Sequence, residues 1–341
     1  MRNPDESSDL GERAKTDVRR QTAVAPPRVT KPLEWWLTRQ LVRVLSGIGR
    51  ILPDSALSPL GRAVGDLAWS AMPRYRRVAL ANLHRVYGAE WDEQQIDATA
   101  RTSFRHLGIT LLEFFLQEPR ITGEEVDRRV RFEGQEHFEA AFARGKGVIL
   151  ITAHYGNWEM MGPRLARAGY QVSAVSRTAD DPATERMIES IRTRCGLRQI
   201  PRRQAARLGL AALRRNEILA ILMDQNTAEG GVFVSFFGYP ASTATGPAVF
   251  ALKTGAALVP TFCLRETNGT HVMRADPPIY PESTGNRDQD IRRLTGRLTG
   301  AIEAQIRERP ELWCWLHNRW KLQPEASAVG PGEAAPAAMR S

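Results

Sequence analysis

The chain has 341 residues, of which 42% are hydrophobic and 25% charged, as expected for one large globular domain or two ordinary ones with a sizeable core. Its formal net charge is +9, supplied by 42 arginines and only five lysines. This balance favours an anionic partner such as a membrane surface, an acidic carrier or nucleic acid, although a biased genome composition explains the arginine count equally well. The three cysteines, Cys195, Cys263 and Cys314, lack C-x-x-C spacing, so we expect a reducing compartment and neither a zinc site nor a disulfide framework.

The first third of the chain is predicted to be a tail followed by helices. Residues 1–31 and 323–341 have the composition of disordered tails, and we expect no secretory signal because residues 1–30 lack an apolar stretch. No run of 18 or more apolar residues predicts a membrane span. Apolar residues recurring at helical intervals predict four helices, at 33–50, 57–72, 74–87 and 93–117.

The segment 33–72 combines an apolar helical face with aromatic and basic side chains. Trp35, Trp36, Arg39, Arg43 and Arg50 are interspersed among its leucines and valines. Such a helix is typical of one that lies in a membrane interface. The alternative, an amphipathic helix that packs on the rest of the protein, is equally compatible with the pattern.

From about residue 130 short apolar runs alternate with helical segments. The predicted strands are 147–153, 170–176, 217–223, 256–265 and 270–275. The predicted helices are 134–144, 158–168, 181–195, 203–215, 245–254 and 287–309. This alternation predicts an α/β fold with a mostly parallel central sheet covered by helices. We therefore divide the chain into an N-terminal helical arm at 32–120 and an α/β body at 121–322.

The most informative segment is Val148-Ile-Leu-Ile-Thr-Ala-His154-Tyr-Gly-Asn-Trp-Glu159. If the strand stops near Ala153, the chain turns at Gly156 and a helix starts with Asn157 as its N-cap, His154 and Glu159 come within reach of each other. The pair is then a candidate base and its orienting carboxylate. The alternative is that Glu159 is an ordinary first-turn acid and His154 an ordinary turn residue.

Two other predicted strands also end in polar side chains. Arg177 follows the strand at 170–176, and Asp224-Gln225-Asn226 follow the strand at 217–223. Because parallel strands end at one edge of the sheet, we expect His154, Arg177 and Asp224 to face one crevice. Asp224 is interpreted either as a substrate contact or as the partner of an arginine. A hairpin-like piece follows at 230–241, and then a helix at 245–254 that Thr245 is placed to cap.

The end of the chain carries an aromatic and basic cluster, Trp313-Cys-Trp-Leu-His-Asn-Arg319-Trp-Lys321. It is interpreted as closure of the core, as a bilayer anchor or as a stacking surface for bases. The sequence has no G-x-S-x-G, Walker A, G-x-G-x-x-G or H-E-x-x-H motif, which disfavours a hydrolase elbow, a nucleotidase and a zinc protease. We expect no metal and no cofactor.

Taken together, these blocks resemble the lipid A biosynthesis (late, Kdo-dependent) acyltransferases, a branch of the lysophospholipid acyltransferase superfamily. The resemblance covers roughly residues 33–322. Its blocks are His154-Tyr-Gly-Asn-Trp-Glu159, similar to the H-x4-D/E signature, Ser176-Arg177, Asp224-Gln225-Asn226, Phe236–Ala241 with Thr245-Gly-Pro, and Trp315–Lys321.

The resemblance implies transfer of a fatty acyl chain from acyl carrier protein or coenzyme A to a hydroxyl of a membrane glycolipid. A lipid A precursor is the first candidate acceptor, and phosphatidylinositol mannoside or another lysolipid is the alternative. The implied location is the cytoplasmic face of the inner membrane. Because 33–72 carries several arginines, we expect peripheral or monotopic attachment to an anionic membrane surface. The resemblance implies no nucleic-acid partner.

As a mechanistic hypothesis, His154 deprotonates the acceptor hydroxyl and Glu159 holds the imidazole. The candidate substrate-binding residues are Asn157, Arg177, Asp224, Gln225 and Arg319. The acyl slot is assigned to Phe233, Phe236 and Phe237, for which core packing is the alternative, and backbone N–H groups near Gly156 are the candidate oxyanion donors. The rival functions are a non-catalytic membrane binder and a thioesterase in which water is the acceptor.

Overall fold

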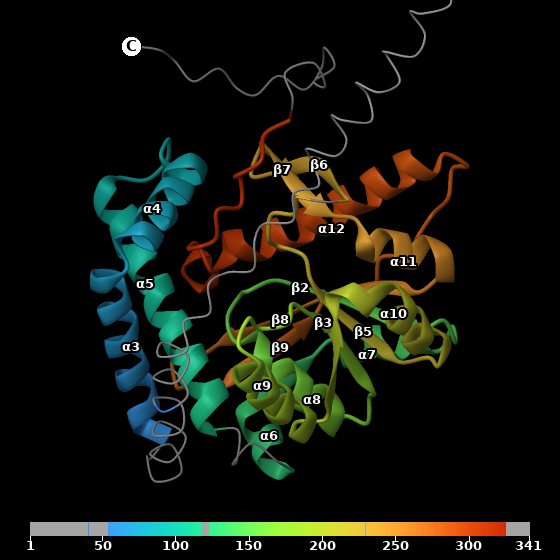
Figure 1. Ribbon diagram of the computed structural model, residues 1–341, viewed down its shortest axis with the longest axis horizontal. Helices are drawn as coiled ribbons and strands as arrows, with labels where there is room; N and C mark the ends of the chain where they lie inside the picture. Colours follow the sequence, from blue (N-terminus) through green and yellow to red (C-terminus); the bar gives the residue numbers. More distant parts are fainter. Residues whose placement is uncertain (1–39, 41–53, 118–122, 229, 325–341) are drawn as a thin grey trace, which may run out of the picture. The chain divides into compact units, whose positions relative to one another are not determined.

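The computed structural model describes residue 40 and residues 54–117, 123–228 and 230–324 (Figure 1). Residues 54–324 belong to one compact unit, Val42–Ser341. The predicted tail at 1–31 and residues 325–341 lie outside the described residues, and so does the predicted helix at 33–50 except for residue 40. The predicted division of the chain at residue 120 stays a prediction.

Three helices precede the sheet, at the positions predicted from the apolar periodicity. They are α3 (Asp54–Ala71), α4 (Pro73–Tyr87) and α5 (Glu93–Leu112), and a π-helical turn, η1 (Glu113–Gln117), continues α5. Pro73 starts α4, while Asp92 and Gln95 form a capping box at the start of α5. Among the described helices, none combines the length and apolarity that crossing a bilayer requires.

Helices α3 and α5 lie side by side (Figure 1) because glycines let their backbones approach closely. A Cβ atom added to Gly61 or Gly65 would collide with the backbone of α5, and one added to Gly108 would collide with the Gly61 carbonyl. Asp66 of α3 also pairs with Arg101 and Arg105 of α5, at 2.7 and 2.9 Å. The two helices therefore form one layer.

The central sheet has seven strands in the order β1-β9-β8-β2-β5-β3-β4, and every neighbouring pair is parallel except β8–β9. The strands are β1 (Val130–Glu133), β2 (Val148–Thr152), β3 (Val172–Ser176), β4 (Leu197–Pro201), β5 (Ile218–Leu222), β8 (Ala257–Arg265) and β9 (His271–Ala275). The predicted mostly parallel α/β fold is confirmed. The edge strands β1 and β4 were not predicted, because each is short and mixes charged or polar residues with its few apolar ones.

Two hydrophobic cores cover the two faces of the sheet. Successive side chains of a strand point to opposite faces, so they belong to different cores. Ile149 and Ile151 of β2 face one core, while Val148 and Leu150 face the other. The first core contains α10 (Ala205–Arg214), α11 (Gly246–Thr254) and α12 (Arg287–Glu308). The second contains α6 (Glu124–Arg129), α7 (Gln135–Phe142) and α8 (Met161–Arg167), whereas α9 (Pro182–Arg194) packs beside β4.

The predicted hairpin-like piece is an antiparallel pair, β6 (Gly231–Phe236) and β7 (Tyr239–Ala244), which packs on α12. Thr245 precedes α11 as predicted, but its hydroxyl donates to the Gly230 carbonyl instead of capping the helix. Three single turns complete the described elements: η3 (Trp158–Met160), η4 (Arg202–Gln204) and η5 (Pro310–Leu312).

Candidate active site

The segment His154–Asn157, here called the His154 loop, connects β2 to the first helical turn. Gly156 has a φ of 58°, and a Cβ atom at this position would collide with the Cys263 carbonyl. The helical part starts with η3 at Trp158, and α8 follows from Met161. The predicted strand, turn and helix are confirmed, and Pro163 is tolerated because it lies in the first turn of α8.

Backbone hydrogen bonds hold this loop on two sides. Gly156 N donates to the Leu312 carbonyl at 2.9 Å, and Asn157 N donates to the Cys263 carbonyl at 2.8 Å. The His154 carbonyl accepts from Cys314 N at 3.0 Å. Since the N–H groups of Gly156 and Asn157 are already engaged, they do not fit the oxyanion role predicted for this turn.

The carboxylate bonded to the imidazole belongs to Asp224, which follows β5. Because β2 and β5 are parallel neighbours with Thr152 opposite Leu222, the residues after the two strands meet. Asp224 Oδ1 lies 2.9 Å from His154 Nδ1, and Oδ2 accepts from His154 N and from Trp313 Nε1, both at 2.9 Å. The expectation that Glu159 provides this contact is therefore corrected.

These contacts determine the charge states of the pair. Burial alone would lower the pKa of His154, but the Asp224 carboxylate outweighs it and raises that pKa above its ordinary value. Burial would raise the pKa of Asp224, but His154 and Trp313 lower it to about 2. With Nδ1–H donated to Asp224, Nε2 is the ring nitrogen that accepts a proton. The His154 side chain is 27% exposed, whereas Asp224 is buried.

Glu159 supports the imidazole indirectly. Its carboxylate accepts from Arg192 Nη2 at 2.7 Å, from Arg192 Nε at 3.2 Å and from Trp158 Nε1 at 3.1 Å. The Trp158 ring packs edge-on to the His154 ring, with centroids 5.0 Å apart. Glu159 thus fixes the indole that packs against the imidazole, a geometry that a five-residue offset cannot reveal.

Asn157 has a different environment from the one expected of a substrate contact and N-cap. Its side chain is 1% exposed and makes no capping hydrogen bond. Its Nδ2 donates to Glu113 Oε2 at 2.6 Å, behind the loop and away from solvent. The prediction that its side chain caps the helix is wrong, because Glu113 offers a buried charged acceptor.

The other predicted substrate-binding residues differ in exposure. Arg177 is exposed and pairs with Asp180 at 3.1 Å, and both Arg177 and Gln225 line the cavity described below. Arg319 is fully buried, where it donates to the Ser242 carbonyl at 2.6 Å and to Thr243 and stacks on Phe236. This burial corrects the expected substrate contact of Arg319, which instead holds β7 in the core.

A cavity of about 780 Å³ opens beside His154. Trp158, Glu159 and Arg192 line it near the imidazole. Apolar and small residues of the sheet and α8 form one stretch of its wall: Leu150, Met161, Gly162, Leu165, Val172, Ala174, Leu197 and Ala220. Residues around α10 and α11 form another: Arg202, Ala205, Ala206, Thr245, Gly246, Pro247, Val249 and Phe250.

The predicted acyl slot does not coincide with this wall. Phe236 and Phe237 are buried in the core and, like Phe233, are not among the residues that line the cavity. Within residues 54–117, 123–228 and 230–324, no group of three or more His, Cys, Asp or Glu side chains is arranged to hold a metal ion.

The chain is similar in sequence to bacterial lipid A biosynthesis acyltransferases. Residues 25–322 match the family described as bacterial lipid A biosynthesis acyltransferase. The lipid A biosynthesis lauroyltransferase of Escherichia coli is 27% identical over 310 residues, which cover 89% of this chain and 95% of the relative. The palmitoleoyltransferase of the same organism is 26% identical over 285 residues, 80% of this chain and 87% of its own.

A phosphatidylinositol mannoside acyltransferase of Mycobacterium tuberculosis is 30% identical over 192 residues. This match covers 55% of the present chain and 58% of the mycobacterial protein, less than two thirds of its length. The family match, by contrast, extends over most of the chain and includes both strand ends that form the His154–Asp224 pair. The chain therefore belongs to the bacterial lipid A biosynthesis acyltransferase family.

Proposed function

We propose that this protein transfers a fatty acyl chain from an acyl thioester to a hydroxyl group of a membrane glycolipid. The observation that carries the proposal is the His154–Asp224 pair at a cavity of about 780 Å³ with a largely apolar wall. The donor is acyl carrier protein or coenzyme A. A lipid A precursor is the first candidate acceptor, in keeping with relatives that match along most of their length.

In this mechanism His154 acts as general base. Its Nε2 takes the proton of the acceptor hydroxyl, and the resulting oxygen nucleophile bonds to the thioester carbonyl carbon. The tetrahedral intermediate collapses with cleavage of the carbon–sulfur bond, and the imidazolium returns the proton to the departing sulfur. Asp224, whose pKa is lowered to about 2, is ionised at neutral pH and stabilises the imidazolium.

The apolar wall between the sheet and α8 is suited to the acyl chain. Gly162, Ala174 and Ala220 leave space there, and leucine, valine and methionine side chains complete the lining. Burial of an alkyl chain contributes about 0.8 kcal/mol for each CH₂ group. Arg177 and Arg202, on the polar part of the cavity wall, are placed to contact phosphate groups of the acceptor or donor.

We propose peripheral or monotopic attachment to the cytoplasmic face of the inner membrane, and the helices α3 to α5 support attachment to a membrane surface. The exposed large hydrophobic side chains of the described residues all lie in or between α3, α4 and α5: Val64, Leu67, Met72, Tyr75 and Leu111. Leu67 is 68% exposed, and arginines 74, 76 and 77 follow close by. Apolar side chains beside cations favour an anionic membrane surface.

The proposal is tested with purified protein, acyl carrier protein carrying a labelled acyl chain, and a lipid A precursor with a free hydroxyl. His154→Ala should lower transfer by roughly 10²–10⁴-fold, the usual contribution of a general base. The control is His84→Ala, which removes an exposed histidine on α4. Transfer at the wild-type rate by folded His154→Ala would contradict the mechanism.

Two further reactions separate the alternatives. Replacing the lipid A precursor by phosphatidylinositol mannoside tests the second acceptor, which is favoured by the 30% identity to the mycobacterial enzyme over its matched part. Omitting the acceptor tests the thioesterase alternative, in which free fatty acid is released. Acyl-coenzyme A in place of the carrier protein distinguishes the donors.

A further inference from the structure

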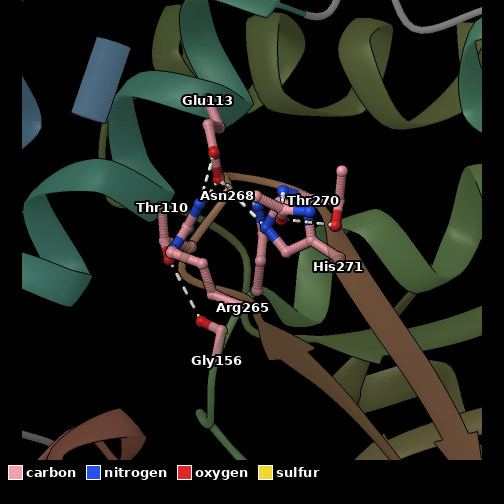
Figure 2. Close-up of polar contacts among 8 residues, drawn as sticks. Thr110, Glu113, Gly156, Arg265, Asn268, Thr270 and His271 are labelled. Carbon is pink, nitrogen blue, oxygen red and sulfur yellow. Dashed lines mark hydrogen bonds and ion pairs between the residues drawn. The ribbon is translucent and has the colours of Figure 1, made fainter. Parts of the chain in front are cut away.

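A buried polar cluster lies on the side of the His154 loop that faces α5 (Figure 2). We call it the Glu113 cluster; its members are Thr110, Glu113, Asn157, Arg265 and His271. Glu113 starts the π-helical turn η1, Arg265 ends β8 and His271 starts the next strand, β9. The helical turn and this strand pair, 152 residues apart in the sequence at Glu113 and Arg265, thus meet behind the loop.

The contacts of the cluster lead to the His154 loop along two paths. The Glu113 carboxylate accepts hydrogen bonds from both terminal nitrogens of Arg265. Its Oε2 also accepts one from Asn157 Nδ2 at 2.6 Å. On the second path, Arg265 Nη2 donates to Thr110 Oγ1 at 3.3 Å, and Thr110 Oγ1 donates to the Gly156 carbonyl at 3.0 Å. Two consecutive residues of the loop are therefore fixed by one carboxylate and its arginine.

Burial of the cluster is deep. Glu113, Arg265 and His271 are each no more than 5% exposed, and His271 Nε2 lies 3.6 Å from Glu113 Oε2. Arg265 and His271 lower the pKa of Glu113 to about 2 against the opposing effect of burial, so the carboxylate is charged at neutral pH. Desolvation offsets much of the attraction between buried ions, and apolar residues often stabilise such a site as well or better. Stability alone therefore gives a weak reason for placing these charges here.

Glu113 lies at the point where α5 passes into a π-helical turn. The wider π-helical turn starts at this residue, and π-helical turns inside or at the end of α-helices are frequent at functional sites. Figure 2 shows Glu113 directed from the helix toward Arg265, with Gly156 on the other side of Arg265. The Glu113 carboxylate thus connects the end of α5 to Arg265 and, through it, to the His154 loop.

We propose that Glu113 is a positioning residue for the acyl transfer: through Asn157 directly, and through Arg265 and Thr110 to Gly156, it fixes the backbone that places His154 on Asp224 and toward the cavity. This inference rests on the proposed function. Glu113 does not touch the reacting atoms, because its contacts lie on the α5 side of the loop and the Asp224 contact lies at the end of β5.

Two variants test this role in the full-length protein, with the same donor and acceptor. Glu113→Gln keeps the shape of the side chain but removes its charge. The double variant Glu113→Leu with Arg265→Met replaces both buried ions by apolar side chains, which is often neutral or stabilising. We expect kcat to fall by roughly 10²-fold in the double variant and less in Glu113→Gln, because misplacement of a catalytic group by about 1 Å costs that much. The KM for both substrates should change by less than about threefold.

The pH profile distinguishes positioning from stability. A looser His154–Asp224 contact removes the influence that raises the His154 pKa. Since the neutral imidazole is the base, the acidic limb of kcat should move to lower pH in both variants. The matched control is Asp290→Asn, another buried carboxylate, which holds Thr284 and Arg293 at the start of α12. This control should lower the melting temperature and leave kcat and the pH profile unchanged.

Wild-type kcat in the folded double variant would overturn the proposal. So would a loss of kcat that matches the loss of folded protein and leaves the pH profile unchanged. The two proposals fail separately. Activity retained by His154→Ala contradicts the proposed function, whereas inactive His154→Ala together with normal Glu113 variants contradicts the positioning role alone.

Discussion

The His154 loop lies between two buried carboxylates, Asp224 on the cavity side and Glu113 on the helix side. Both are 4% exposed, and charged or hydrogen-bonding neighbours lower the pKa of each to about 2. Asp224 accepts hydrogen bonds from the imidazole itself and from the Trp313 indole, whereas Glu113 accepts them from Arg265 and from the Asn157 amide. The two carboxylates are equally buried and equally charged, but only Asp224 contacts His154, the proposed base. They therefore have different roles.

The largest expected effect is on the cavity side. Asp224→Asn keeps the size of the side chain but removes the charge that stabilises an imidazolium, so kcat should fall by roughly 10²–10⁴-fold. The acidic limb of kcat should move to lower pH, because Asp224 raises the His154 pKa. Steady-state kinetics against pH measures both effects. A loss smaller than that of Glu113→Gln would reverse the comparison between the two sides.

On the helix side, a single substitution of Arg265 is expected to lower the free energy of unfolding. Arg265→Met leaves Glu113 buried without its main partner, which should lower the free energy of unfolding by about 3–5 kcal/mol at neutral pH. Urea titration of Arg265→Met and of the double variant measures this difference. A double variant as unstable as the single one would show that lost packing, and not an unpaired charge, causes the effect.

The stabilisation that Glu113 contributes through its lowered pKa depends on pH in a defined direction. It is fully present above the unfolded-state pKa of about 4.5, and it is lost as pH falls toward the folded-state pKa of about 2. Below that range the charged partner of Arg265 is neutral, so the difference between wild type and Arg265→Met should shrink. Unfolding measured between pH 7 and 3 checks this trend.

A smaller effect is expected for Glu159, which makes no hydrogen bond to the imidazole and acts on it through the Trp158 indole and through its more distant charge. Glu159→Gln retains an acceptor for the indole but loses the charge that pairs with Arg192. We expect kcat to fall about tenfold, equivalent to about 1.4 kcal/mol, which is within the cost of weakening a charge-assisted hydrogen bond. A loss as large as that of Asp224→Asn would contradict the assignment of Asp224 as the main carboxylate partner of the imidazole.

Much of the fold follows from local patterns in the sequence. The apolar run at Val148–Thr152, the turn at Gly156 and the periodic helices α3 to α5 all depend on neighbouring residues, and each was predicted. The edge strands β1 and β4 were not, since edge strands need bury only part of their residues and lack the continuous apolar run of a central strand.

The site was predicted less completely because its contacts join distant segments. His154 and Asp224 were both singled out at strand ends, but their pairing requires β2 and β5 to be neighbours, and strand order is not written in either segment. Glu113 lies in a helix predicted from apolar periodicity, where nothing local marks an inward carboxylate. The feature that marks Glu113 as an inward-facing carboxylate is its buried partner Arg265, which lies 152 residues away in the sequence.

The central claim is that Asp224 raises the pKa of His154 and thereby makes it the base. The most direct test is an NMR titration of the His154 ring in wild type and in Asp224→Asn, with the His154→Ala spectrum used to assign the His154 signal among the six histidines. The account predicts a His154 pKa above about 6.5 in wild type and a clearly lower value in the variant. An identical pKa in the two proteins would contradict it.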